Sequence, residues 1–177
     1  MKKVLVSFVV AAAVFMPTKF VFAKDSNSIL VIDIEKIANE SLAGKDMQLK
    51  IQKQQKKIQS QIEEKKAELT KKAQKLQEKK SSLPPKEFEE KANNLQNEIM
   101  VLDGKFQEDI EDLQKQQQNA SQVIIDKVKE ISAKIAKKHG SIMVVASNSV
   151  FYADDNINIT SEVIKSLDKD FPKVNIE

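Results

Sequence analysis

The sequence predicts a mainly α-helical protein with a small β base (α+β), in which a long antiparallel helical hairpin forms an arm. Three observations predict this fold. Residues 36–139 are rich in Lys, Gln, Glu, Ala, Leu and Ile, and one proline pair, Pro84-Pro85, divides this region. Apolar residues recur along it at helical spacing. Short apolar segments rich in β-branched residues flank it, which places strands at the two ends of the hairpin.

Residues 1–23 have the layout of a secretory signal peptide. Lys2 and Lys3 precede an apolar run from Val4 to Met16, and Ala23 supplies the small residue at the expected cleavage site. The run is shorter than the roughly 20 apolar residues that span a bilayer, although an uncleaved anchor is the alternative. Export predicts a periplasmic protein whose mature chain begins at Lys24.

The base of the fold is expected to consist of residues 24–35 and 140–177. Its first strand covers 28–34, where the nearly continuous apolar run Ile29-Leu30-Val31-Ile32 indicates burial on both faces. The arm then occupies 36–139.

The tip of the hairpin is expected at 82–86. Proline lacks an amide donor and restricts the residue before it, so the outgoing helix should stop near 81–83. Proline is tolerated in the first turn of a helix, so a second helix should begin at Pro85. Lys137, Lys138 and His139, followed by Gly140, are typical of a helix C-terminus.

A narrow apolar stripe on each helix predicts a coiled-coil pairing rather than a compact bundle, because a bundle needs a wider apolar face. Eleven-residue spacings in the returning helix indicate a nearly straight pair. The outgoing stripe is Met47, Ile51, Ile58, Ile62, Leu69, Leu76 and Leu83. The returning stripe is Phe88, Ala92, Leu95, Ile99, Leu102, Phe106, Ile110, Leu113, Gln117, Ala120, Ile124, Val128, Ile131 and Ile135.

After the arm, the sequence predicts two more strands, at 141–147 and 150–152. Thr160 is then expected to cap a final helix, 161–169, with Val163, Ile164 and Leu167 on its apolar face. Three short strands have two open edges, which favour pairing with another chain, so we expect an oligomer built on a shared sheet or barrel. The candidate oligomerisation residues are Ile29, Val31, Ile32, Ile142, Val144, Val145, Val150 and Tyr152.

The composition favours a protein without enzymatic activity or cofactor. Cysteine is absent, which excludes disulfides and thiolate chemistry, and His139 is the one histidine. The segment Asp154-Asp155-Asn156 resembles the start of a calcium loop, but Ile159 and Lys165 stand where Gly and Glu are required. We therefore expect no catalytic or metal site.

Charge is unevenly distributed along the arm. Residues 50–86 contain twelve lysines and four glutamates, whereas the mature chain is nearly neutral because three of the 29 lysines lie in residues 1–23. A basic surface here could attract acidic client chains or anionic membrane lipids, or it could simply be a solvated helix flank. Near-neutral net charge argues against a nucleic-acid partner. The candidate client-binding lysines are Lys56, Lys57, Lys65, Lys66, Lys71 and Lys72.

Three apolar residues on the arm lie outside the stripes and are further candidates for client binding: Leu49, Met100 and Val101. Exposed apolar side chains can form adaptable contacts with a client. Scattered exposed apolar residues are also normal on protein surfaces, so this interpretation has an equally simple alternative.

The whole predicted layout resembles the Skp/OmpH family of periplasmic chaperones. The most specific match is the tail from Phe151 to Ile164, FYADDNINITSEVI, which is similar to that family's ending Y-x-D…D-I-T-D-x-V-I, with departures at Asn158 and Ser161. The resemblance implies a homotrimer in which three arms hang from a strand barrel, like a jellyfish, around a central cavity. It also implies ATP-independent holding of unfolded outer-membrane proteins.

The leading functional hypothesis is therefore a periplasmic holdase for unfolded outer-membrane proteins. The alternative is a structural coiled-coil adaptor of the cell envelope. A protein that holds many unfolded clients should suppress their aggregation, whereas an adaptor should retain one folded partner in fixed proportion.

Overall fold

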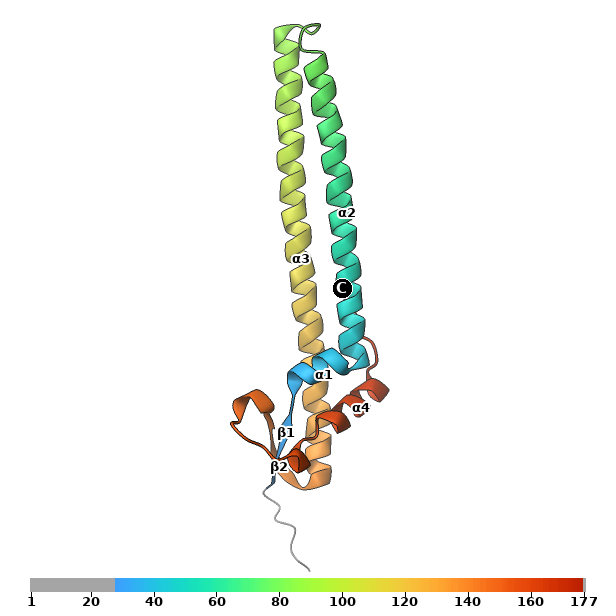
Figure 1. Ribbon diagram of the computed structural model, residues 1–177, viewed down its shortest axis with the longest axis vertical. Helices are drawn as coiled ribbons and strands as arrows, with labels where there is room; N and C mark the ends of the chain where they lie inside the picture. The colour runs from blue at the N-terminus through green and yellow to red at the C-terminus, as the bar shows by residue number, and fades with distance from the viewer. Residues whose placement is uncertain (1–27, 177) are drawn as a thin grey trace, which may run out of the picture.

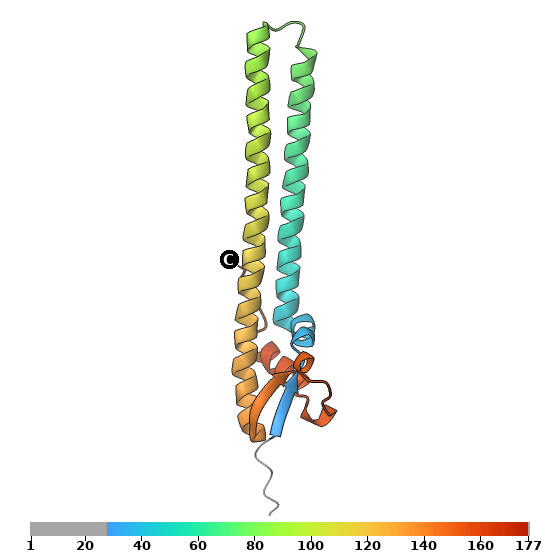
Figure 2. The same cartoon turned by 90° about the vertical axis from the view of Figure 1, so that its left-hand side faces the viewer.

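The computed structural model describes residues 28–176, and the predicted signal peptide lies outside the described residues. Its shape is a long arm of two helices standing on a small base, as Figures 1 and 2 show from two sides. The elements in chain order are β1 (Ser28–Ile32), α1 (Ile34–Glu40), α2 (Leu42–Glu78), α3 (Pro85–His139), β2 (Ser141–Ala146), the 3-10 turns Ser147–Ser149 and Asp155–Ile157, and α4 (Thr160–Asp170).

The arm is formed by α2 and α3, which lie side by side and run in opposite directions (Figure 1). At ~1.5 Å per residue, α2 with 37 residues is about 55 Å long and α3 with 55 residues about 80 Å. The final turns of α3 therefore continue below the start of α2 and enter the base. The predicted glycine C-cap of α3 is confirmed, since Gly140 has a left-handed φ of 67°.

The tip differs slightly from the prediction. Helix α2 ends at Glu78 rather than near 81–83, and the next residues form a turn in which the Ser82 and Leu83 amides both donate to the Lys79 carbonyl. Ser81 and Ser82 are weak helix formers, and Leu83 precedes a proline, so the helix gains little by continuing. The second helix begins at Pro85, as predicted.

The apolar seam between the two helices is buried near the base and only half-buried toward the tip. Met47 and Ile51 of α2 are buried, as are residues of α3 from Phe106 to Ile135. Between residues 52 and 105, by contrast, no apolar side chain is buried; seam residues such as Leu69 and Leu102 are half-buried. Two helices alone leave their common seam open on both sides, whereas the base adds a third layer of packing.

The sheet contains two parallel strands, so the prediction of a third strand at 150–152 is wrong. Leu30 pairs with Val144 and Ile32 with Ala146, and the arm is the crossover connection that a parallel pair requires. Residues 150–152 form an exposed loop in which Tyr152 projects from the base. A β-branched and aromatic triplet resembles a strand in composition, but here it has no strand beside it to pair with.

The other edge of β1 is covered by the segment before α4. Val31 forms an isolated bridge with Asn158, and the Ile159 amide donates to the Val31 carbonyl at 2.9 Å. As a result β1 is flanked on both sides, and the free edge of the described sheet belongs to β2.

Thr160 has a different role from the predicted helix cap. It is the first residue of α4, and Ile159 occupies the cap position without a side-chain hydrogen bond. The buried Thr160 hydroxyl instead accepts a hydrogen bond from the Asp33 amide at 2.8 Å and donates to Asn158 Oδ1 at 2.6 Å. It therefore fixes the start of α4 to the end of β1. Of the predicted apolar face of α4, Val163 and Leu167 are completely buried and Ile164 is half-buried.

A sharp corner separates α1 from α2, although the sequence suggested one continuous helix. The completely buried Ser41 caps α2 by accepting the Gly44 amide at 3.1 Å. Asp168 of α4 accepts the Leu42 amide at 2.7 Å. A Cβ atom at Gly44 would lie 1.8 Å from the Ala38 carbonyl oxygen, so the corner requires glycine at this position.

The segment after α4, residues 171–176, returns along the lower end of the arm (Figure 1), and we call it the strap. Val174 and Ile176 are buried in the same apolar cluster as Met47 and Ile51. Among the helices described, none is long and apolar enough to cross a membrane.

The glycine at the α1–α2 corner provides a stability prediction. Gly44→Ala should lower the free energy of unfolding by about 3 kcal/mol, because the added methyl group would overlap the Ala38 carbonyl. Urea unfolding followed by circular dichroism measures this change.

Gly104→Ala is the matched control for that substitution. Gly104 is exposed and lies in the middle of α3, and no atom lies within 4 Å of the position that an added Cβ would take. Alanine should therefore raise the free energy of unfolding by about 1 kcal/mol. Equal effects of the two substitutions would show that helix propensity, and not the close approach at the corner, determines the result.

The strap should release in acid. The Lys50 ammonium, and after it the Val174 amide, hold the pKa of Asp46 below its ordinary value of 3.8. Because this folded-state pKa is lowered, strap docking is fully stabilised above about pH 4 and is weakened as the pH falls through the folded-state value. The ¹⁵N–¹H resonance of Val174 should therefore titrate in this acidic range.

In Asp46→Asn the same resonance should show no such titration. The Ile159 amide donates to a backbone carbonyl and should not follow the transition in either protein. A Val174 resonance that keeps its position through the acidic range would contradict the assignment of this contact.

Candidate functional site

The candidate functional features of the described residues are grooves on the arm and an exposed sheet edge. Within residues 28–176, no three His, Cys, Asp or Glu side chains are placed to hold a metal ion. His139 Nε2 lies 3.0 Å from Glu162 Oε2, and Lys138 lies 2.9 Å from the other oxygen of that carboxylate. Hydrogen bonds from Lys138 and then His139 lower the pKa of Glu162, so this cluster joins the end of α3 to α4.

A mixed apolar and cationic groove lies along the distal half of the arm, and we call it the arm groove. Its volume is about 620 Å³. Leu69 of α2 and Val101 and Leu102 of α3 form its apolar part, and Val101 is 73% exposed. The complete lining is Lys65, Glu68, Leu69, Lys72, Asn94, Asn97, Glu98, Val101, Leu102 and Lys105.

Ion pairs join the charged side chains that line the arm groove, including one pair between its two helices. Lys72 Nζ lies 2.6 Å from Glu98 Oε2 on the opposite helix and 3.7 Å from Glu68 Oε1. The hydrogen bond to Glu98 raises the pKa of Lys72, and the hydrogen bond from Lys65 lowers the pKa of Glu68. These pairs are about half exposed, so each contributes little stability, and their side chains can exchange partners easily.

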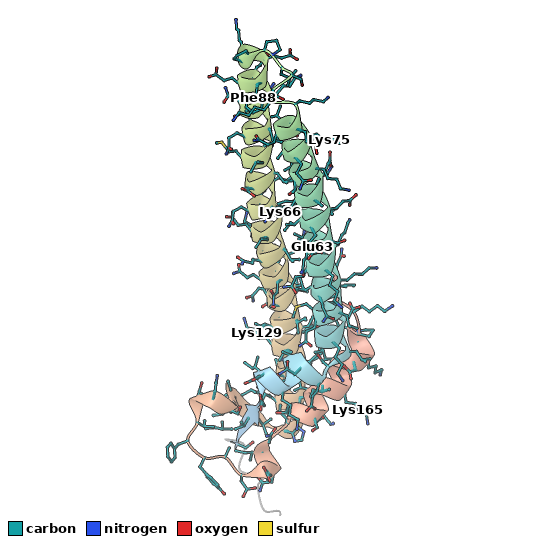
Figure 3. All side chains as sticks on the ribbon, turned by 45° about the horizontal axis from the view of Figure 1, so that its top comes forward. Glu63, Lys66, Lys75, Phe88, Lys129 and Lys165 are labelled. Atoms are coloured by element: carbon teal, nitrogen blue, oxygen red, sulfur yellow. The ribbon has the colours of Figure 1, made fainter. Side chains whose placement is uncertain are left out.

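The six candidate lysines divide into two groups. Lys65 and Lys72 line the arm groove and are paired, as just described. In the described structure the other four are exposed on α2 and have no carboxylate within 4 Å: Lys56, Lys57, Lys66 and Lys71. Figure 3 shows charged side chains standing out along the whole arm, Lys66 and Lys75 among them.

The three candidate apolar residues do not form one patch. Val101 lies in the arm groove, and its neighbour Met100 is 63% exposed outside that groove. Leu49 borders a different groove of about 590 Å³ at the lower end of α2, lined mainly by glutamines and lysine with Met47 and Ile51. The structure therefore brings Val101 together with Lys65 and Lys72 and places Leu49 elsewhere.

Sequence reasoning missed the contribution of the seam itself to the arm groove. The sequence places Leu69 and Leu102 in the stripes that pair the two helices, and the structure shows that they are half-buried and also line the groove. The available signal was the polar character of many outgoing seam positions, because Lys, Gln or Ala opposite a leucine cannot cover it completely.

The candidate oligomerisation residues differ in how far their side chains are exposed. Val31 and Ile32 are buried inside the chain, and Val144 packs against its core. Val145 and Val150 are half-buried, the latter in the loop before Tyr152. The candidates with exposed side chains are Ile29, Ile142 and Tyr152.

The free edge of β2 carries one of these exposed candidates, Ile142, and we call this edge the sheet edge. Ile142 is the extra residue of a β-bulge, because Ser28 pairs with Ser141 and Ile29 with Met143. Ile142 and Met143 are 67% and 50% exposed. They border a groove of about 410 Å³ between β2 and α3, which also contains the buried hydroxyl of Ser132, unpaired within the described structure.

Comparison with known proteins supports the resemblance noted from the sequence. The family model described as outer membrane protein (OmpH-like) matches residues 28–167, which include both strands, the arm and most of α4. A search of the curated proteins found no match.

A crystal structure of a proposed outer membrane chaperone (OmpH-like) from Caulobacter crescentus CB15 has a similar fold. The TM-score is 0.81, with 85% of this chain and 89% of that chain covered. The sequence identity is 16%, so this likeness concerns the fold alone. The family match covers most of the chain and confirms the resemblance on its own: this chain belongs to the OmpH-like outer membrane protein family.

Proposed function

We propose that this protein is an ATP-independent periplasmic holdase that binds unfolded outer-membrane proteins and prevents their aggregation. Family membership supports a chaperone role without enzymatic activity, and the family's chaperones act in the periplasm. The predicted signal peptide at residues 1–23 agrees with that location. The observation that carries the proposal is the incompletely covered seam of the distal arm.

The distal arm suits a client that has no fixed structure. Its half-buried leucines and the exposed Val101 can accept apolar segments, while Lys65, Lys72 and Lys105 provide movable charges beside them. Each contact is weak, because each side chain is already partly covered or paired. Many such contacts can retain an unfolded chain by their number and still release it without ATP.

We propose that three chains assemble through the sheet edge and that their arms surround the client. The β2 edge has unpaired backbone groups, and the apolar Ile142 and Met143 are exposed beside them. The proposed number of three chains comes from the family resemblance.

The exposed lysines outside the arm groove favour contact with anionic membrane lipids at the periphery of the proposed holdase. Lys56, Lys57, Lys66 and Lys71 have no carboxylate partner in the described structure and lie on the exposed arm. Such lysines add electrostatic attraction to a negative surface, and salt weakens this attraction.

A structural adaptor of the envelope remains the alternative function for a rod of this kind.

The holdase proposal is tested by diluting a urea-unfolded outer-membrane β-barrel protein into buffer with the full mature chain and following light scattering. Aggregation should be suppressed when the trimer is present in an amount stoichiometric with the unfolded barrel protein. For Val101→Asp, the chaperone concentration required for suppression should rise about tenfold, because the substitution places a charge in the apolar part of the arm groove.

Met100→Asp is the matched control, since Met100 is similarly exposed on the same helix but lies outside the groove. A clearly smaller loss is expected for it. Equal losses would show that general surface apolarity, and not the groove, binds the client. Absence of suppression by the unmodified chain at large excess would remove the holdase proposal and favour the adaptor.

Ile142→Asp should convert the oligomer to monomers by light-scattering mass measurement. Ile142 is a better probe of assembly than Val144, since Val144 packs against the core of its own chain. Val101→Asp should leave the mass unchanged. Retention of the full oligomer by a folded Ile142→Asp chain would show that another surface drives assembly.

A further inference from the structure

The strap has the character of an extended β-type segment although it belongs to no sheet. Val174 and Ile176 are buried, while Asn175 between them and Lys173 before them are exposed. This alternation with a period of two is the pattern of an extended chain with one face against an apolar surface. That surface is the apolar cluster at the junction of arm and base, which includes Met47 and Ile51.

The arm also binds the main chain of the strap at Val174. The Val174 amide donates to Asp46 Oδ2 at 3.1 Å, and the Val174 carbonyl accepts from Lys50 Nζ at 2.6 Å. Asp46 and Lys50 are one helical turn apart on α2 and are themselves paired at 2.8 Å. An acceptor and a donor at this spacing match the amide and carbonyl of a single residue in an extended chain.

These contacts do not depend on a particular strap sequence. Two side chains bind backbone groups, which every residue except proline possesses, and the apolar surface requires only apolar side chains at alternate positions. The strands of outer-membrane barrels have that alternation. The strap also lies beyond residues 28–167, the part of the chain that matches the family model.

We propose that the strap occupies a binding site for extended client segments with apolar side chains at alternate positions and acts there as a built-in competitor. The site consists of Asp46 and Lys50 together with the apolar surface around Met47 and Ile51. This inference rests on the proposed holdase function. Release of the strap exposes the site, and a client segment then makes the same two backbone hydrogen bonds.

A competitor of this kind keeps the apolar surface of the site covered in the absence of client. Client affinity at the site is reduced by the fraction of time for which the strap is docked. A strap docked about nine-tenths of the time reduces the apparent affinity about tenfold. Weak, reversible holding is what a chaperone without ATP requires.

Two substitutions in the full-length chain separate a competitor from a simple structural brace. Val174→Asp should undock the strap and leave the site intact, and client affinity should rise about tenfold. Asp46→Ala should also undock the strap but damage the site, so client affinity should stay unchanged or fall. A brace predicts the same direction of change for both variants, and that result would overturn the inference.

A peptide with the sequence of residues 169–177, labelled with a fluorophore, tests the site without any client. It should bind the Val174→Asp chain, measured by fluorescence anisotropy, and should bind the unmodified chain at least about fivefold more weakly, because the strap already occupies the site. The same peptide with Asp in place of the valine is the control and should not bind. Circular dichroism of each variant checks that the fold is retained.

The outcomes distinguish this inference from the holdase proposal. If the unmodified chain suppresses aggregation while Val174→Asp gains no affinity and binds no peptide, the strap inference is wrong and the holdase stands. If the peptide binds but excess peptide does not displace an unfolded barrel protein, the strap is a brace alone. If no chain suppresses aggregation but the peptide still binds, the holdase proposal is wrong, and with it the competitor role.

Discussion

The arm depends on one apolar seam between α2 and α3, and this seam is closed by other elements only at its lower end. There, α1, α4 and the strap add further layers over Met47, Ile51 and the final turns of α3, and the side chains become buried. Farther along, two helices share one stripe with nothing above or below it, so Leu69 and Leu102 stay half-exposed. The gradient of burial from base to tip follows from geometry, and it leaves a long accessible surface on a scaffold that is anchored firmly at one end.

The anchoring is achieved by hydrogen bonds between segments that are distant in sequence. Thr160 connects the Asp33 amide to Asn158, Asp168 accepts the Leu42 amide, and Glu162 bridges Lys138 and His139. All three contacts involve α4 and join it to β1, α2 and α3 in turn. The segment 151–164, which carries the most specific family resemblance, supplies two of these contacts, and Asp168 farther along the same helix supplies the third. Helix α4 therefore helps to hold the arm in place on the base, while β2, through which we propose that the chains assemble, also packs directly against α3.

The sequence allowed the arm to be predicted because helix periodicity, the proline pair and Gly140 are local signals. The features that could not be predicted from the sequence depend on contacts between residues that are far apart in the chain. The α1–α2 corner depends on Ser41 and Gly44 meeting Ala38 and Asp168, and the strap depends on Asp46 and Lys50. The triplet 150–152 has strand-like residues but no strand to pair with. At the candidate site, the sequence identifies Val101 by its position outside the apolar stripe, whereas its grouping with Leu69 and Lys72 requires knowledge of how the two helices face each other.

Hydrogen–deuterium exchange of the full mature chain, with and without an unfolded outer-membrane β-barrel protein, tests the central claim most directly. Without client, exchange should be slowest in the base and fastest in the distal arm, because local opening costs less where little is buried. Bound client should slow exchange in residues 65–72 and 94–105, which line the arm groove, and leave the sheet strands unchanged. Protection confined to the base, with an unchanged distal arm, would contradict the account.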